Sequence, residues 1–223
     1  MKIQVRLFAA LRERAGSGSV EVELPDGAVV GDVWPALELG EEPSGLLYAV
    51  NRAYADRGSR LSTGDEVAVI PPVSGGEEPP SGSEPQGRFR LSEQPLSIEE
   101  AVVQVRDEEA GAIATFVGTT RARSRGREVL YLEYEAYEGM AEQVMADLAD
   151  DLKRRHHLCE VAIHHRIGRV EIGETSVVIA VSAAHRAAAL AACKDAIDEL
   201  KVSVPLWKKE MYVGGEEWIG QGS

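Results

Sequence analysis

Cysteine is scarce in this sequence, and no long hydrophobic run occurs. The two cysteines among 223 residues, Cys159 and Cys193, do not have the spacing of a metal or redox motif. Neither a CxxC nor an HExxH pattern is present, so the common zinc motifs are excluded. No apolar run approaches the roughly 18 residues of a membrane-spanning helix. We therefore expect a cytoplasmic protein with no signal peptide and no membrane partner.

Positive charge is also in short supply. The chain has 24 Lys and Arg residues against 37 Asp and Glu residues, which gives a net charge of −13 at pH 7. The excess is spread along the chain, with −4 in residues 1–76, −3 in residues 77–87 and −6 in residues 88–223. Such a balance disfavours nucleic-acid binding. A local basic cluster in this chain therefore indicates a small anionic ligand.

Residues 77–87 contain no aliphatic or aromatic side chain. Such a segment cannot bury enough apolar surface to offset its ordering entropy, so we interpret it as a flexible linker. It follows Gly75–Gly76 and separates a domain of residues 1–76 from a domain of residues 88–223. Two glycines without Cβ atoms can lie extended in a narrow channel. The pair therefore suggests a mobile tail, and a simple flexible turn is the alternative.

The first domain has the pattern of a small β protein with one helix. Ile3, Val5 and Leu7 alternate with polar residues, as in a strand with one buried face. Residues 30–37 have the apolar spacing of a helix, but Pro35 removes a backbone donor, so we expect a short or kinked helix. The predicted strands are residues 3–7, 20–24, 46–50 and 66–70. The order ββαββ followed by two glycines is the layout of a β-grasp domain.

The second domain has strands and helices interleaved. Ser97 and Glu100 have the spacing of a capping box, and we expect the helix after them to run to about Glu109. The strand at 175–183 is almost entirely apolar, which predicts a central place in a sheet. The other predicted elements are strands at 111–117, 129–134 and 161–163, helices at 138–155 and 186–202, and a short strand after Pro205. The pattern is that of an α+β domain.

Two basic places in this domain could bind an anion. Arg121 ends the loop Gly118–Arg121 that follows a predicted strand. His185 and Arg186 precede a predicted helix, whose free backbone N–H groups attract anions, although His185 could also serve only as a cap. The further arginines of the first loop, Arg123, Arg125 and Arg127, are interpreted as solvated.

Two lysines could move protons. Lys208 follows Trp207, and a lysine that is partly desolvated beside an apolar wall has a lowered pKa, which suits it to proton transfer. Lys201 lies near the end of a predicted helix, where a lysine also complements the helix dipole. The adjacent histidine pairs, His156 with His157 and His164 with His165, point to opposite sides where they lie on strands, so we interpret them as structural or surface residues.

Three segments of the first domain resemble a known family. Residues 50–52, 64–67 and 70–76 are similar to the small subunit of molybdopterin synthase, a ubiquitin-like sulfur carrier. In that family the last glycine is adenylated and converted to a thiocarboxylate. The resemblance therefore implies that Gly76 carries sulfur and that an adenylating enzyme of the ubiquitin-activating type is a partner. The motif itself does not distinguish such a carrier from a ubiquitin-like protein modifier.

Several ordered blocks of the second domain resemble the large, catalytic subunit of the same enzyme. They are residues 116–121, 132–137, 140–141, 164–168, 181–186 and 200–210. The chain thus resembles a fusion of the two subunits, with a β-grasp domain, a linker and an α+β domain of the α/β-hammerhead type. By this resemblance the substrate is cyclic pyranopterin monophosphate, the product is the molybdopterin dithiolene, and the large domains form a homodimer.

The resemblance also assigns site residues. It places Arg121, His185 and Arg186 at substrate-binding positions and Lys201 and Lys208 at catalytic positions, and we expect His185, Arg186, Lys201 and Lys208 to line one cleft. It implies no metal and no cofactor other than the thiocarboxylate.

The fusion departs from the family in one respect. A thiocarboxylate needs a free carboxyl, but Gly76 is joined to Glu77. We therefore predict proteolysis after Gly76, which makes a processing protease a further partner. The sequence is also compatible with two alternatives. One is a ubiquitin-like modifier precursor fused to an anion-binding module, and the other is a hydrolase of phosphorylated small molecules.

Overall fold

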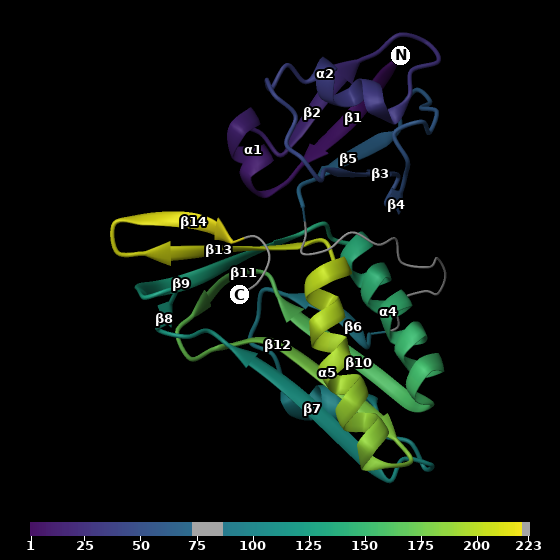
Figure 1. Cartoon of the computed structure of the whole chain (residues 1–223), viewed down its shortest axis with the longest axis vertical. Helices are drawn as coiled ribbons and strands as arrows, with labels where there is room; N and C mark the ends of the chain where they lie inside the picture. Colours follow the sequence, from purple (N-terminus) through teal and green to yellow (C-terminus); the bar gives the residue numbers. More distant parts are fainter. Residues whose placement is uncertain (73–86, 220–223) are drawn as a thin grey trace. The chain divides into compact units, whose positions relative to one another are not determined.

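The computed structural model describes residues 1–72 and 87–219 of the chain. The Gly75–Gly76 pair and most of the predicted linker lie outside the described residues. The chain divides into two units, Met1–Glu78 and Pro79–Ser223 (Figure 1). Each unit has its own sheets and core, as the sequence predicts for two domains.

The first unit is a five-stranded mixed sheet with the strand order β2-β1-β5-β3-β4. β1 pairs in parallel with β5 at the centre, while β2 and β3 pair antiparallel on either side. The strands are β1 (Lys2–Leu7), β2 (Ser19–Glu23), β3 (Leu47–Val50), β4 (Ala53–Tyr54) and β5 (Glu66–Ile70). Alternate residues of β1, Ile3, Val5 and Leu7, are buried in the core, as their spacing predicts. The predicted β-grasp arrangement is confirmed.

The helices of the first unit differ in part from the prediction. A short helix, α1 (Ala9–Ala15), lies between β1 and β2, where none was expected. The predicted helix at 30–37 is short, as expected from Pro35. It consists of a 3-10 turn, η1 (Val30–Asp32), and one turn of α-helix, α2 (Val33–Ala36). An Asp32 carboxylate oxygen accepts a hydrogen bond from the Val29 backbone N–H at 2.9 Å and fixes the start of the turn.

The second unit contains two sheets. The first has the order β6-β10-β12-β7, with β12 central as predicted, and the second has the order β11-β9-β13-β14, with β8 paired to β9. The strands of the first sheet are β6 (Phe89–Ser92), β7 (Ala112–Thr119), β10 (Leu158–Arg166) and β12 (Thr175–Ala183). Those of the second are β8 (Arg123–Ser124), β9 (Arg127–Ala136), β11 (Gly168–Glu171), β13 (Leu206–Tyr212) and β14 (Gly215–Ile219).

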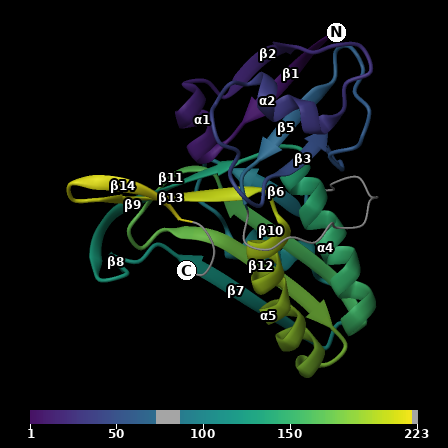
Figure 2. The ribbon, with the colours of Figure 1, turned by 45° about the horizontal axis from the view of Figure 1, so that its top comes forward.

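Helices cover both faces of the first sheet. α3 (Ile98–Gln104) packs on the face formed by Ala162, Val178 and Ala180. α4 (Met140–His156) and α5 (Arg186–Ser203) lie side by side along the sheet, as Figures 1 and 2 both show. The second sheet extends away from these two helices (Figure 1).

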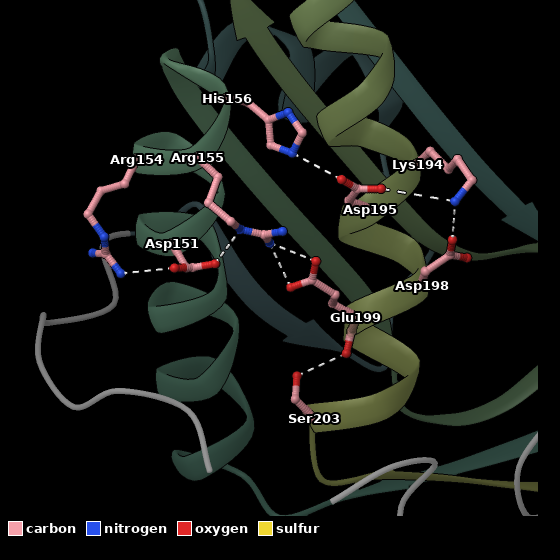
Figure 3. Close-up of polar contacts among 9 residues, drawn as sticks. All are labelled: Asp151, Arg154, Arg155, His156, Lys194, Asp195, Asp198, Glu199 and Ser203. Atoms are coloured by element: carbon pink, nitrogen blue, oxygen red, sulfur yellow. Dashed lines mark hydrogen bonds and ion pairs between the residues drawn. The ribbon is translucent and has the colours of Figure 1, made fainter. Parts of the chain in front are cut away.

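Polar contacts also join α4 and α5 (Figure 3). Arg155 donates two hydrogen bonds to the Glu199 carboxylate, at 2.6 and 2.8 Å, and pairs with Asp151 at 2.5 Å. The next residue of α4, His156, lies 3.0 Å from an oxygen of Asp195, one turn before Glu199 in α5. These contacts fix the last turns of α5 against its neighbour.

Two predicted details of the second unit are wrong. α3 ends at Gln104, short of the expected Glu109. Only half of the capping box forms, because the Ser97 hydroxyl accepts the Glu100 backbone N–H at 3.1 Å while the Glu100 carboxylate pairs with Arg90 of β6. The bidentate bond to an arginine is charge-assisted and therefore stronger than a bond to a backbone N–H.

Candidate active site

Lys208 lies on β13, between β9 and β14, where it is opposite Tyr134 and Ile219. Its side chain is 19% exposed. Burial lowers the pKa of Lys208, the Glu210 carboxylate opposes this effect, and the charges of Lys201 and Arg121 lower the pKa further. The predicted desolvated lysine is therefore confirmed, and a larger fraction of its amine is unprotonated at neutral pH than in an ordinary lysine.

Glu210, which the sequence analysis missed, is the ionic partner of Lys208. Its residue is only 2% exposed, and one carboxylate oxygen lies 3.2 Å from Lys208 Nζ. Burial raises the pKa of Glu210, but the hydrogen bonds from the Tyr212 and Ser124 hydroxyls and the charge of Lys208 outweigh burial, so the pKa lies below its usual range. Glu210 is therefore a buried, charged carboxylate. The signal in the sequence was its position two residues after Lys208, on the same face of one strand.

Lys201 and Arg121 are close enough to Lys208 for their charges to act on it. Arg121 follows the end of β7, and Lys201 lies in the last turn of α5, with both side chains exposed. The structure thus brings together three of the five described residues that the sequence marks as functional. Two exposed cations next to a half-desolvated lysine form a place where an anionic substrate can be bound and protonated.

His185 and Arg186 lie elsewhere in the unit. Arg121 follows Thr119, which pairs with Thr175 at the start of β12, whereas His185 follows Ala183 at the end of β12. Eight residues of strand separate these ends by about 26 Å. Along α5, Lys201 is fifteen residues from Arg186, a distance of about 22 Å. One chain therefore does not bring His185, Arg186, Lys201 and Lys208 together in one cleft, and that expectation is wrong.

The buried histidines lie inside the fold. His164 and His165 point to opposite faces of β10, as predicted for neighbours on a strand. His164 Nε2 lies 2.9 Å from the Gln104 amide oxygen of α3, and His165 Nδ1 donates to the Arg166 carbonyl at 2.7 Å. Burial lowers the pKa of both, and for His165 it lowers the pKa to about 4.

Arg127, interpreted from sequence as solvated, makes two contacts. It pairs with Glu217 of β14, and its guanidinium lies 3.8 Å from the centre of the Tyr212 ring. Arg125 approaches the same Glu217 at 3.9 Å. The contact between a guanidinium and an aromatic ring is favourable, so Arg127 covers the ring of Tyr212, which lies four residues after Lys208 on β13.

Comparison with known proteins identifies relatives of both domains. Residues 91–203 match the family model described as MoaE protein, and residues 5–76 match the ThiS family. The chain is 47% identical over 133 residues to the molybdopterin synthase catalytic subunit of Halalkalibacterium halodurans, and 46% identical over 133 residues to that of Bacillus subtilis. Each match covers 60% of this chain and 85% of the relative.

Solved structures match the second unit. A molybdopterin synthase structure from Staphylococcus aureus aligns with a TM-score of 0.59 at 36% identity, over 61% of this chain and 99% of that chain. Molybdopterin cofactor biosynthesis protein E from Burkholderia multivorans aligns with a TM-score of 0.52 at 33% identity, over 62% of this chain and 94% of that chain.

The fold and the comparisons define the chain as an enzyme of molybdenum cofactor biosynthesis. It belongs to the MoaE family, the catalytic subunits of molybdopterin synthase, and carries a ubiquitin-like ThiS-family domain in the same chain. Within the described residues no helix is long and apolar enough to cross a membrane.

Proposed function

We propose that the chain is a molybdopterin synthase in which both subunits are fused. It transfers two sulfurs from thiocarboxylated Gly76 tails to cyclic pyranopterin monophosphate and forms the molybdopterin dithiolene. For each sulfur, a thiocarboxylate and a substrate oxygen become a carboxylate and a substrate sulfur, so the exchange is balanced. The observation that carries the proposal is the half-desolvated Lys208 beside the cations Lys201 and Arg121.

The lysines have distinct parts in this scheme. Lys208, whose pKa burial lowers, gives up its proton more readily than an ordinary lysine and acts as the general acid and base. Lys201, exposed at the end of α5, polarises the thiocarboxylate carbonyl or protonates the leaving oxygen. Arg121, at the same end of the unit, binds the anionic part of the substrate.

His185 and Arg186 join this site only if a second chain supplies them. They open α5, whose N-terminal N–H groups attract anions, but they are at the far end of the helix from Lys201. A symmetric dimer of second units resolves the separation, because each chain then contributes one end of α5 to each of two equivalent sites. The separation of the two ends of α5 in one chain supports such a homodimer.

The donor tail requires processing. A thiocarboxylate forms only on a free carboxyl, and Gly76 is followed by Glu77 in the sequence. We expect a protease to cut after Gly76 and an adenylating enzyme of the ubiquitin-activating type to activate the new terminus. Intact-mass spectrometry of active protein from its native host should show a fragment that ends at Gly76, and active preparations containing only the full-length chain would contradict this step.

The reaction is tested with cleaved, thiocarboxylated protein and the cyclic pterin, with the dithiolene product measured. Lys208→Ala and Lys201→Ala should each reduce the rate by about a hundredfold or more, the usual range for loss of a proton-transfer group. Lys194→Ala is the matched control, because Lys194 is exposed on the same helix as Lys201 and pairs with Asp198. Near-normal rates in both lysine variants, or product formation without Gly76, would rule out the proposed reaction.

A further inference from the structure

Lys208, Glu210 and Tyr212 occupy alternate positions of β13. Side chains at i, i+2 and i+4 of a strand share one face of the sheet. On this face Tyr134 lies opposite Lys208, and Leu132 lies opposite Glu210. The pairing with β9 shifts register between Met211 and Tyr212, but the Tyr212 hydroxyl still donates to Glu210. The three residues therefore form a row, with the candidate catalytic lysine at one end and a tyrosine at the other.

Glu210 is the central member of the row and is held from both sides. The Tyr212 hydroxyl donates a hydrogen bond to one carboxylate oxygen, and Lys208 Nζ lies 3.2 Å from the other. The Ser124 hydroxyl of β8 is a further donor. Only 2% of the residue is exposed, so water cannot replace these partners easily. Each protein donor therefore has a large effect on how strongly the Glu210 carboxylate interacts with its other partners.

Tyr212 is itself firmly placed. Its ring packs with Val129 and Leu132 of β9 and is buried. The Arg127 guanidinium lies over the ring at 3.8 Å and is fixed by its ion pair with Glu217. A ring held by these contacts presents its hydroxyl to Glu210 in a defined orientation.

We propose that Tyr212 is a positioning residue for sulfur transfer. It holds the Glu210 carboxylate so that this carboxylate orients Lys208 and accepts from both the Tyr212 hydroxyl and the Lys208 ammonium. The inference rests on the proposed function, because it takes Lys208 as the proton-transfer group. Tyr212 does not touch the substrate in this scheme and acts only through Glu210.

The direction in which the Lys208 pKa changes follows from the competition between Tyr212 and Lys208 for the Glu210 carboxylate. When the Tyr212 hydroxyl is removed, the carboxylate has one donor fewer and becomes a stronger partner for the Lys208 ammonium, so the pKa of Lys208 rises. When the carboxylate itself is removed in Glu210→Gln, the pKa of Lys208 falls. The other charged or titratable groups that act on this row are Lys201, Arg121, Tyr134, Arg127 and Glu217. They are unchanged in both variants.

The experiment measures Lys208 directly and then the reaction. The chain has six lysines, so carbon-13 labelling of lysine side chains gives a spectrum in which the Lys208 signal is assigned from its loss in Lys208→Arg. The titration of this signal is compared in the full-length wild-type chain, Tyr212→Phe and Glu210→Gln. The pH profile of kcat is then measured for the same proteins in the cleaved, thiocarboxylated form.

Tyr131→Phe is the matched control. Tyr131 lies on the neighbouring strand β9 opposite Met211, so its side chain points to the other face of the sheet. It also carries an arginine over its ring, Arg169 at 3.7 Å. The variant thus removes a tyrosine hydroxyl beside a stacked arginine without touching the row of Lys208, Glu210 and Tyr212.

For Tyr212→Phe we expect the Lys208 titration and the corresponding limb of the kcat profile to move to higher pH. The loss of one hydrogen bond should reduce kcat roughly two- to tenfold at neutral pH, with KM changed less than about twofold. Glu210→Gln should move the titration the other way, and Tyr131→Phe should not move it. An unmoved Lys208 titration in Tyr212→Phe, or an equal shift in Tyr131→Phe, overturns the inference. A shifted titration in a protein that makes no dithiolene supports the coupling and refutes the proposed function instead.

Discussion

At the scale of single residues, burial alone does not decide which groups of the second unit are charged. Glu210 is almost fully buried, but three donors keep its pKa below the usual range, so it remains a carboxylate. His165 is equally buried and has one neutral hydrogen bond, to the Arg166 carbonyl, so burial lowers its pKa to about 4. The difference lies in the partners that each group has for its charged form.

The first prediction concerns the stability of the second unit in acid. The pKa of His165 falls from 6.5 to about 4 on folding, so between these values the unfolded chain binds more protons than the folded chain. Its contribution is fully present above about pH 6.5 and is lost as the pH falls towards 4, with about 3 kcal/mol as its upper bound. The free energy of unfolding, measured in urea, should therefore fall more steeply for wild type than for His165→Phe as the pH is lowered through this interval.

Phenylalanine is chosen because it retains a ring against Tyr134, which contacts the His165 ring edge-on at 4.8 Å. Tryptophan fluorescence in a Trp34→Phe background leaves Trp207 and Trp218 as reporters of the second unit. His164, whose pKa burial also lowers, is common to both proteins and cancels in the comparison. Parallel pH dependences in the two proteins would show that His165 does not act as described.

The sequence identified the lysine but not the residues that control it. Lys208 could be predicted as desolvated because Trp207 precedes it. The Ser124 hydroxyl, which donates to its partner Glu210, could not be predicted, because Ser124 belongs to a two-residue strand that pairs with β9 only in the folded sheet. Contacts of this kind depend on the register between strands, which one sequence does not specify.

At the scale of elements, long segments were predictable and short ones were not. The strand at 175–183 and the helices at 138–155 and 186–202 match β12, α4 and α5 to within two residues, because several apolar repeats define each. β11 and β14, with four and five residues, have too few repeats for a period. α1 has seven residues, and its two buried side chains, Ala9 and Leu11, give no helical spacing.

The second prediction separates two contributions to the attachment of α4 to α5. The Arg155 and Glu199 side chains are 41% and 38% exposed, so solvent screens their ion pair (Figure 3). Arg155→Met should therefore lower the free energy of unfolding by less than about 1 kcal/mol. Leu152→Ala, three residues earlier in α4, removes a fully buried side chain and should cost about 2–5 kcal/mol.

Urea unfolding with the same tryptophan reporters measures both variants, and 1 M salt is the control condition. Salt should remove most of the small effect of Arg155→Met, because exposed charges are screened within a few ångströms at that concentration. It should leave the effect of Leu152→Ala nearly unchanged, because that effect arises from apolar burial. A larger loss in Arg155→Met than in Leu152→Ala would show that the ion-pair network, rather than the core, joins the helices.

At the scale of the whole molecule, the candidate site residues lie at opposite ends of α5, so the number of chains that form one site has to be determined. Lys201 is near Lys208 and Arg121, while His185 and Arg186 lie about 22 Å away at the other end of the helix. The sequence marked all five residues but placed four of them, His185, Arg186, Lys201 and Lys208, in one cleft. A linear motif does not specify which end of a helix faces which copy. In the proposed function, the described residues of one chain form two half-sites, and the proposed dimer joins each half-site to its complement.

The last prediction tests that assembly by mixing inactive variants. His185→Ala chains and Lys208→Ala chains, co-expressed and then cleaved and thiocarboxylated, should regain about a quarter of wild-type activity, because half of randomly paired dimers are mixed and each mixed dimer has one intact site. Lys201→Ala mixed with Lys208→Ala is the matched control. Both changes fall in the same half-site, so every site in every dimer retains a defect and no activity returns. If each chain formed a complete site alone, neither mixture would recover, and recovery in the first mixture only is the result that a shared site requires.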